Sequence, residues 1–371
     1  MTLSKSTKRN IQTVVFTLAF GGLGYGVGNL IGRLAKGKLE LGADPVWLWA
    51  TPLLMLGVIL LHEGGHAVAG WLVGFRLHML TAGPLRWDRQ GGKMKLGFNR
   101  QLGLWGGICA SVADPEVPPG LKHLRQRTLW MVLGGPLASV LGTVVGLGLA
   151  WWLGPGPQRL LLGLFGLTNG AIALATAIPQ CMGGFVSDGK RVLDLMKEGP
   201  AADRFCAVAT LGSLSQKVRP RDWPREVVEM ATAWEDDSYD GITAAFLRYS
   251  FHLDRREIAE ARVWLEKMLA KVEEWPGSFQ PIVYSSAAYF YAMEEPDAEK
   301  AESYHAKSCK SAIIPAEGKV LNEAALAVLR GEKETVKAAV ERGLRLAANH
   351  TGSAGEALRE TLELIEARAS R

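Results

Sequence analysis

The sequence predicts a mainly helical protein in two parts: a polytopic membrane helix bundle of about four spans with a membrane-associated β-hairpin, and a soluble α-helical domain after it. Three observations lead to this prediction. Long apolar runs recur through the first 200 residues, the loops between them are basic, and from Gly199 the segments become charged and amphipathic. The expected domains are 1–44, a signal-anchor span and linker; 45–198, a membrane core with its hairpin at about 75–100; and 199–371, a cytoplasmic helical domain.

The charge is divided unevenly along the chain. Residues 1–200 carry 19 Lys+Arg against 9 Asp+Glu (net +10), whereas the remainder carries 23 against 28 (net −5). Because the basic residues lie in loops between apolar runs, membrane topology explains the high pI better than nucleic-acid binding does. The cysteines lack CxxC spacing, so neither a cysteine metal site nor a disulfide framework is indicated: Cys109, Cys181, Cys206 and Cys309.

Four apolar runs are long enough to cross a bilayer. Basic residues precede the run 11–31, which is too long and glycine-rich for a cleaved signal peptide and is interpreted as a signal anchor. The other spans are expected at about 47–73, 130–153 and 160–178. The charge bias then places both termini on the cytoplasmic side of a cell membrane, expected to be a bacterial inner membrane.

The loop 75–127 holds nine basic and three acidic residues, which makes it cytoplasmic by the positive-inside rule. Its first part predicts two strands, Phe75 to Trp87 and Lys93 to Phe98, joined by a glycine turn. An edge strand at this place could hold a peptide in extended form. The alternative is a hairpin that only caps the helix bundle.

The C-terminal half predicts helices separated by short proline-containing loops. Helix pairs of this kind favour a tetratricopeptide-like α-solenoid, although no consensus repeat can be written, and an ordinary helical bundle is the alternative. The clearest helical periodicity lies at 254–273, 297–311 and 319–330.

The motif His62-Glu63-Gly64-Gly65-His66 places two imidazoles and a carboxylate inside the second apolar run. On a helix, residues four apart lie on one face, so both imidazoles can bind one zinc ion while Glu63 stands beside the water. Placing an ionisable group near the bilayer centre costs at least ~2.5 kcal/mol of free energy, and binding of a metal ion would explain why three such groups are present. The pattern is typical of a metalloprotease.

A third ligand is expected from far downstream. Catalytic zinc commonly takes three protein ligands and a water, and Asp188 follows the end of the last span on the side of His66. The alternative is that Ser187 or Asp188 is the N-cap of a helix running to Lys197. Asp114 and Asp194 are rival ligands.

Together these residues resemble the site-2 protease family of intramembrane zinc metalloproteases over about residues 45–197. The features that carry the resemblance are HEGGH within a span, the hairpin ending Phe98–Gly107, Gly134-Gly135-Pro136 in the third span, and Ser187-Asp188-Gly189 after the fourth. The resemblance implies that His62, His66 and Asp188 bind one Zn²⁺ per chain and that Glu63 is the catalytic carboxylate.

Two positions depart from the family pattern. Ser139 stands where the family usually has an asparagine that is thought to hold the substrate or polarise the scissile carbonyl. Ser139 or Asn169 could supply that support, or both could simply form interhelical hydrogen bonds. The interval between Pro179 and Asp188 is also longer than in the family motif.

The predicted function is cleavage of a transmembrane or membrane-proximal peptide bond in a membrane-protein substrate. The expected partners are that substrate, the lipid bilayer and a protein regulator on the C-terminal helical domain, with no nucleic acid. The alternative is a non-catalytic metal-binding membrane scaffold that acts through the C-terminal domain, although the intact Glu63 argues against it. A metal transporter is disfavoured because the charged groups form one compact set rather than a path.

Overall fold

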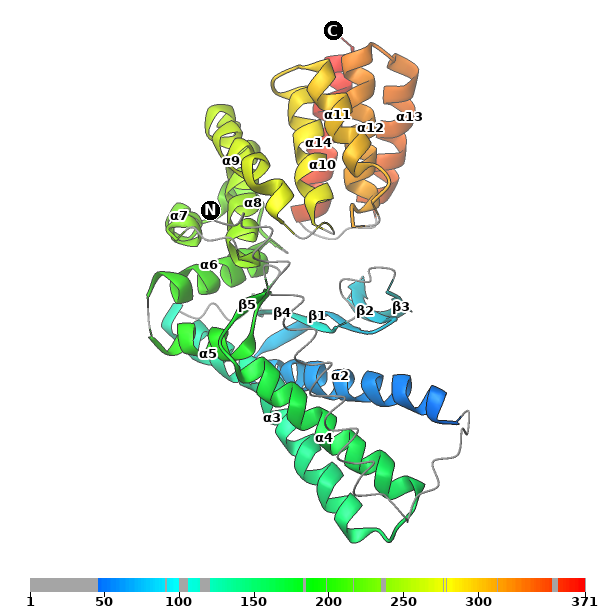
Figure 1. The fold of residues 1–371 in the computed structure, drawn as a ribbon. Coiled ribbons are helices and arrows are strands. Elements are labelled where there is room, and N and C mark those ends of the chain that lie inside the picture. Colours follow the sequence, from blue (N-terminus) through cyan, green and yellow to red (C-terminus); the bar gives the residue numbers. More distant parts are fainter. Residues whose placement is uncertain are drawn as a thin grey trace, which may run out of the picture. The chain divides into compact units, whose positions relative to one another are not determined.

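The computed structural model (Figure 1) describes residues 46–90, 92–99, 106–113, 121–182, 185–197, 199–215, 217–234, 238–275, 277, 279–311, 313–348 and 353–370. The expected signal anchor at 11–31 lies outside these residues, so a fourth span remains a prediction. Within them the chain is mainly helical, with a small antiparallel sheet. It divides into two compact units: one extends to Lys197, and residues 90–93 and 112–121 group with Glu198–Arg371 in the other.

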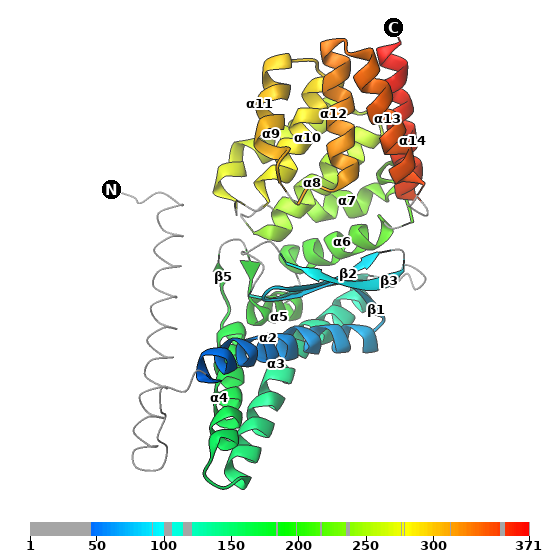
Figure 2. The same ribbon diagram turned by 90° about the vertical axis from the view of Figure 1, so that its right-hand side faces the viewer.

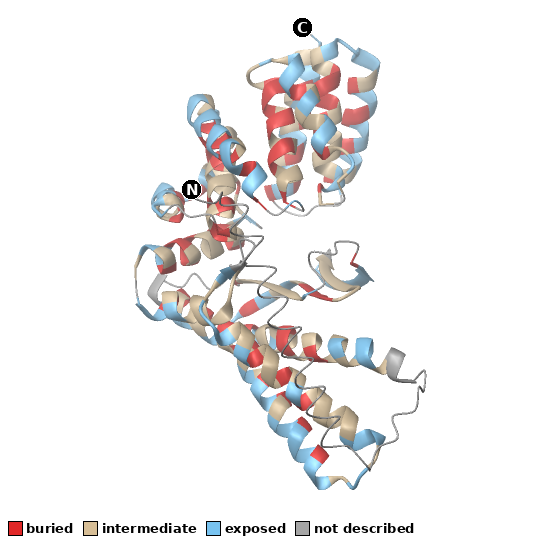
Figure 3. Cartoon of the chain, viewed as in Figure 1, coloured by how far each residue is buried: buried red, intermediate tan, exposed pale blue. Residues whose placement is uncertain are grey.

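Three helices among the described residues are long and apolar enough to cross a membrane: α2 (Val46–Leu72), α3 (Leu121–Trp152) and α4 (Pro157–Ala177). Only 22%, 33% and 17% of their most apolar windows are buried in the protein, and Figure 3 shows exposed surface along these helices. Exposed leucine, valine and tryptophan side chains at this density are unfavourable in water and suited to lipid. The three helices therefore fit a membrane protein.

The helix α3 begins earlier than its apolar run. The apolar run predicts this span from Trp130, but the helix starts at Leu121. The additional turns carry basic residues, including Arg125 and Arg127, which can remain helical outside the hydrocarbon. Pro157 then opens α4 at a position where its missing N–H costs nothing.

A four-stranded sheet follows α2, where a two-stranded hairpin was expected. Its order is β3-β2-β1-β4, and β1 and β2 pair antiparallel with Ala82 opposite Leu85. The expected single strand from Phe75 to Trp87 is wrong, because Gly83 takes a positive φ of 51° and, with Pro84, turns the chain. The strands are β1 (Phe75–Ala82), β2 (Leu85–Gln90), β3 (Lys93–Phe98) and β4 (Ile108–Ala113).

Arg127 fixes the corner between α2 and β1. Gly74 makes this turn with a φ of 81°. The guanidinium of Arg127 donates hydrogen bonds to the carbonyls of Val73 and Gly74, the latter at 2.7 Å, and lies 5.4 Å from the centre of the Phe75 ring. These bonds satisfy two carbonyls of the turn that follows α2, and they tie the end of α2 to the first turns of α3.

The second unit is an array of helices. Each helix packs mainly against its neighbours in sequence, and Figures 1 and 2 show α10 to α14 side by side. Buried aromatic and aliphatic side chains of α8 to α14 form the larger core, and residues of α6, α7 and α8 form a smaller one. A tetratricopeptide-like repeat in this array remains a prediction. The helices are α6 (Pro200–Leu214), α7 (Arg225–Thr232), α8 (Tyr239–Asp254), α9 (Ile258–Lys271), α10 (Gln280–Met293), α11 (Ala298–Ser308), α12 (Ala316–Arg330), α13 (Lys333–Ala347) and α14 (Ser353–Ala369).

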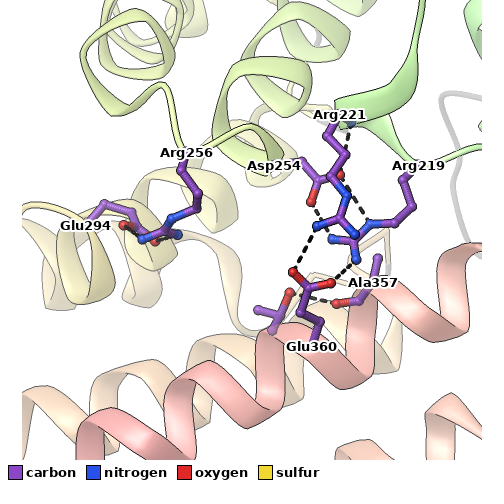
Figure 4. Close-up of polar contacts among 8 residues, drawn as sticks. Arg219, Arg221, Asp254, Arg256, Glu294, Ala357 and Glu360 are labelled. Carbon is purple, nitrogen blue, oxygen red and sulfur yellow. Dashed lines mark hydrogen bonds and ion pairs between the residues drawn. The ribbon is translucent and has the colours of Figure 1, made fainter.

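Two arginines connect distant segments of this array (Figure 4). The buried guanidinium of Arg219 pairs with Asp254 at the end of α8 and with Glu360 on α14. Arg256, with a positive φ of 62°, makes two 2.8 Å bonds to the buried carboxylate of Glu294. Charge-assisted bonds of this kind fix the α8–α9 turn against α10 and the last helix.

Candidate metal centre

A close crossing of α2 and α3 brings the site together. A Cβ atom on Gly65 would lie 2.4 Å from the carbonyl oxygen of Gly134, and a Cβ on Gly134 would lie equally close to the carbonyl of Gly65. Only glycine at both positions allows the two backbones to approach this closely. The approach sets the HEGGH turn of α2 directly against the middle of α3.

Three potential ligands converge at this crossing. Nε2 of His62 lies 3.2 Å from one carboxylate oxygen of Asp188, and Nε2 of His66 lies 3.5 Å from the other. With bonds of ~2.0–2.1 Å in tetrahedral geometry, two ligand atoms of one zinc ion are about 3.4 Å apart. The donor atoms of all three residues lie within 4.8 Å of one another, so the group could hold a metal ion.

Both histidines turn their other ring nitrogen toward α3. Nδ1 of His62 lies 2.9 Å from the hydroxyl of Ser139, and Nδ1 of His66 lies 3.0 Å from the carbonyl oxygen of Met131. A carbonyl only accepts, so Nδ1 of His66 carries a proton, and Nε2 is the nitrogen that a metal ion would take. The Gly135 N–H, at 3.3 Å from the same Nδ1, is then a packing contact, and a side chain at Gly135 would collide with the ring.

The segment Ser187-Asp188-Gly189 presents the acid. The short strands β5 (Cys181–Met182) and β6 (Phe185–Val186) pair after α4, and α5 (Asp188–Lys197) follows. Ser187 is the N-cap of α5. Its hydroxyl donates to the carbonyl of Ile178 at 2.7 Å and accepts from the backbone N–H of Lys190 at 3.3 Å. Asp188 is therefore the first helical residue, and its carboxylate is available to the histidines.

Two further features hold Asp188 in place. A Cβ on Gly189 would lie 1.9 Å from the carbonyl oxygen of Ala177, so glycine lets α5 pack on the end of α4. Burial raises the pKa of the Asp188 carboxyl, but hydrogen bonds with His62 and His66 outweigh it and lower the pKa to about 2. The carboxylate is thus held in its ionised form, which is the form that binds a cation.

One of the two rival acids, Asp194, does not join this group, and the other lies outside the described residues. Asp194 is engaged by Lys190 one helical turn away, at 2.7 Å. Asp114 lies outside the residues that the structure describes.

Glu63 is held from the side of the sheet. The carboxylate is buried, accepts a hydrogen bond from the backbone N–H of Cys109 on β4, and lies within electrostatic reach of both imidazoles and of Asp188. Gly107, just before β4, takes a φ of 100°, and a Cβ there would lie 2.6 Å from a Glu63 carboxylate oxygen. The start of β4 therefore packs directly on the acid of the HEGGH motif.

The two residues proposed to support a substrate lie deeper in the bundle. Ser139 is fully buried against His62. Asn169, also buried, donates to the carbonyl of Phe165 on its own helix at 2.8 Å and faces Gly142 of α3. Asn169 makes no hydrogen bond to the three ligands or to Glu63 within the described structure.

β4 and the Met131 partner of His66 were not predicted from the sequence, and Ser139 was named there without His62 as its partner. The run Ile108–Ala113 is apolar and is preceded by two glycines, which is a usable strand signal. The Met131 carbonyl and the Cys109 N–H leave no signal, because a backbone group is present at every residue.

No family model, curated protein or solved structure matches this chain.

Proposed function

We propose that this protein is an intramembrane zinc metalloprotease of the site-2 type. One observation carries the proposal: His62 and His66 of an apolar helix converge with Asp188, and Glu63 of the same turn is buried beside them. Two imidazoles and one carboxylate leave a coordination position open, as catalytic zinc sites do.

The adjacent acid favours hydrolysis over other uses of this donor set. Two histidines and a carboxylate also suit ferrous iron in oxygenases. A carboxylate beside the open position is what a hydrolase needs as a general base, so Glu63 supports zinc and peptide-bond hydrolysis. Bound zinc would supply Lewis acidity, which activates water and polarises the peptide carbonyl.

The chain's own residues then divide the work. Glu63 takes a proton from the attacking water and passes it to the nitrogen of the leaving amine, so that one water and one peptide bond become a carboxylic acid and an amine. The N–H of Cys109 holds the Glu63 carboxylate in position for both transfers. His62, His66 and Asp188 bind the metal and take no part in proton transfer.

The substrate we propose is a membrane-spanning or membrane-proximal segment. The α3 residues that contact the two histidines run from Met131 to Ser139. They follow the exposed Trp130 by one to nine residues, so at a helical rise of about 1.5 Å per residue the site lies within about 14 Å of that tryptophan along the helix axis. A helical substrate hides its peptide bonds and must unwind before attack. β3 and β4 are the two edge strands of the sheet, where an extended peptide could add as a further strand, and β4 carries Cys109 beside Glu63.

The second unit has a separate role in this proposal. Its helical array, on the cytoplasmic side in the proposed topology, recruits a substrate or a protein regulator. The proposed location is a bacterial inner membrane with both termini cytoplasmic.

The decisive experiment compares cells that express the wild type with cells that express Glu63→Gln. Quantitative analysis of membrane proteins is expected to show a single-span protein that is shortened by the wild type and accumulates intact with Glu63→Gln. Gly64→Ala is the control variant, because a Cβ at Gly64 meets no atom within 4 Å and the substitution should leave cleavage intact. The same membrane-protein fragments with Glu63→Gln as with the wild type, while both proteins bind zinc, would instead support the non-catalytic scaffold.

A further inference from the structure

Ser139 lies on the α3 face that meets the HEGGH turn. Its side chain is entirely buried, and its hydroxyl oxygen is 2.9 Å from Nδ1 of His62. Nδ1 and Nε2 are on different edges of an imidazole, and Nε2 of His62 is the atom that faces Asp188 at 3.2 Å. Ser139 therefore contacts the ring from the edge away from the ligand cluster.

This contact decides where the proton of His62 resides. A neutral imidazole that offers Nε2 to a metal carries its proton on Nδ1, and that N–H needs an acceptor when it is buried. Without one, the ring either leaves a buried N–H unpaired, which is unfavourable, or moves the proton to Nε2, where it blocks the metal. The hydroxyl of Ser139 is positioned to accept.

His66 shows the same arrangement with a backbone group. Its Nδ1 meets the carbonyl oxygen of Met131 at 3.0 Å, two helical turns before Ser139 on the same face of α3. One helix thus sets the orientation of both rings. Of the two acceptors only Ser139 is a side chain, so its contribution can be removed by substitution.

We propose that Ser139 is a positioning residue that holds His62 in its metal-binding orientation and so sets the affinity of the site, and that it does not contact substrate. This inference rests on the metal site of the proposed function. It assigns the buried hydroxyl to the metal ligand and leaves substrate binding to groups that a peptide can reach, such as the backbone of the edge strands.

The test measures zinc affinity of the full-length protein in detergent by competition with a chelator. Loss of an outer partner of a metal-bound histidine lowers affinity 10–100-fold, so Ser139→Ala is expected to bind zinc roughly 10–100-fold more weakly than the wild type. Ser139→Thr retains the hydroxyl and should restore affinity to within about threefold. Thr143→Val is the matched control: it removes a hydroxyl one turn away that, among the described residues, bonds to the Ser139 carbonyl at 2.9 Å.

Ser139→Cys provides a second variant in case Ser139→Ala does not fold, because it fills the site with a side chain of similar shape, slightly larger than serine, that is a poor acceptor; its affinity should lie below that of the wild type. Equal affinity of the folded Ala or Cys variant and the wild type would overturn the inference while leaving the proposed function intact. A wild type that binds no zinc would overturn both. Wild-type zinc affinity of Ser139→Ala combined with a raised KM for a cleaved reporter would show that Ser139 contacts substrate.

Discussion

Adjacent glycines in the HEGGH motif provide a sharp test of the helix crossing. A Cβ on Gly64 would meet no atom within 4 Å, whereas a Cβ on Gly65 would lie 2.4 Å from the carbonyl oxygen of Gly134. A close carbon–oxygen contact is about 3.3 Å, so Gly65→Ala forces α2 and α3 apart by about 1 Å. The atoms that a Cβ on Gly65 would meet belong to the backbone of Gly134 or to an alanine methyl group, and neither can rotate away.

The magnitude follows from the bonds that cross this interface. The contacts of His62 with Ser139 and of His66 with the Met131 carbonyl are 2.9 and 3.0 Å long. An added separation of about 1 Å would take both beyond hydrogen-bonding distance. Each lost partner lowers metal affinity 10–100-fold, so together they predict a decrease of roughly 10²–10⁴-fold. Overpacking should also destabilise the protein by about 1–3 kcal/mol.

The assay is chelator competition for zinc with purified Gly64→Ala and Gly65→Ala, alongside thermal unfolding. Gly64→Ala should retain wild-type affinity and gain roughly 0.5–1 kcal/mol, because alanine favours the helix over glycine. Equal affinity in the two variants would refute the close crossing and the role of α3 in orienting the histidines.

Three further substitutions test other parts of the structure. Gly189→Ala places a Cβ 1.9 Å from a backbone carbonyl and should displace the third ligand, lowering zinc affinity at least tenfold in the same assay. In urea unfolding of the second unit, Arg219→Ala should lower the free energy of unfolding by about 3 kcal/mol, because the guanidinium is buried with its partners. Glu360→Ala should lower it by under ~1 kcal/mol, because the Glu360 side chain is half-exposed. Equal losses in the two variants would contradict this difference. The pKa of Glu257 is lowered to about 2, chiefly by a hydrogen bond from Arg255. A carboxyl whose pKa is lowered on folding stabilises the fold fully at pH values above its ordinary pKa of 4.5, and this stabilisation is lost as the pH falls toward 2. The free energy of unfolding of the wild type should therefore exceed that of Glu257→Gln by its full amount at pH 7 and by less below about pH 4.5. A difference that does not change with pH would refute this prediction.

The grouping of His62, His66 and Asp188 was predictable because it depends on local rules. The spacing of His62 and His66 fixes their common face once the segment is helical, and the position of Asp188 follows from the end of the last span. The alternative reading of Asp188 as a helix cap could not be decided from sequence, since Ser187 and Asp188 are both good caps. The structure gives that role to Ser187 and so leaves Asp188 available.

The surroundings of the ligands were not predictable, because they depend on how closely two helices approach. Ser139 lies 77 residues from His62, and the close approach of α2 and α3 at Gly65 and Gly134 brings them together. The turn at Gly83 did have a local signal, a Gly-Pro pair, but the apolar pattern on either side favoured one continuous strand.

The central claim is that one metal ion is bound by two imidazoles and the Asp188 carboxylate inside an apolar bundle. Zinc stoichiometry combined with X-ray absorption at the zinc edge, measured on Glu63→Gln and on Glu63→Gln with Asp188→Ala, tests it most directly. The account predicts one zinc per chain with two imidazole nitrogens and carboxylate oxygen in the single variant, and at least a tenfold loss of affinity in the double variant. Unchanged stoichiometry and affinity without Asp188, or sulfur atoms around the zinc, would contradict it.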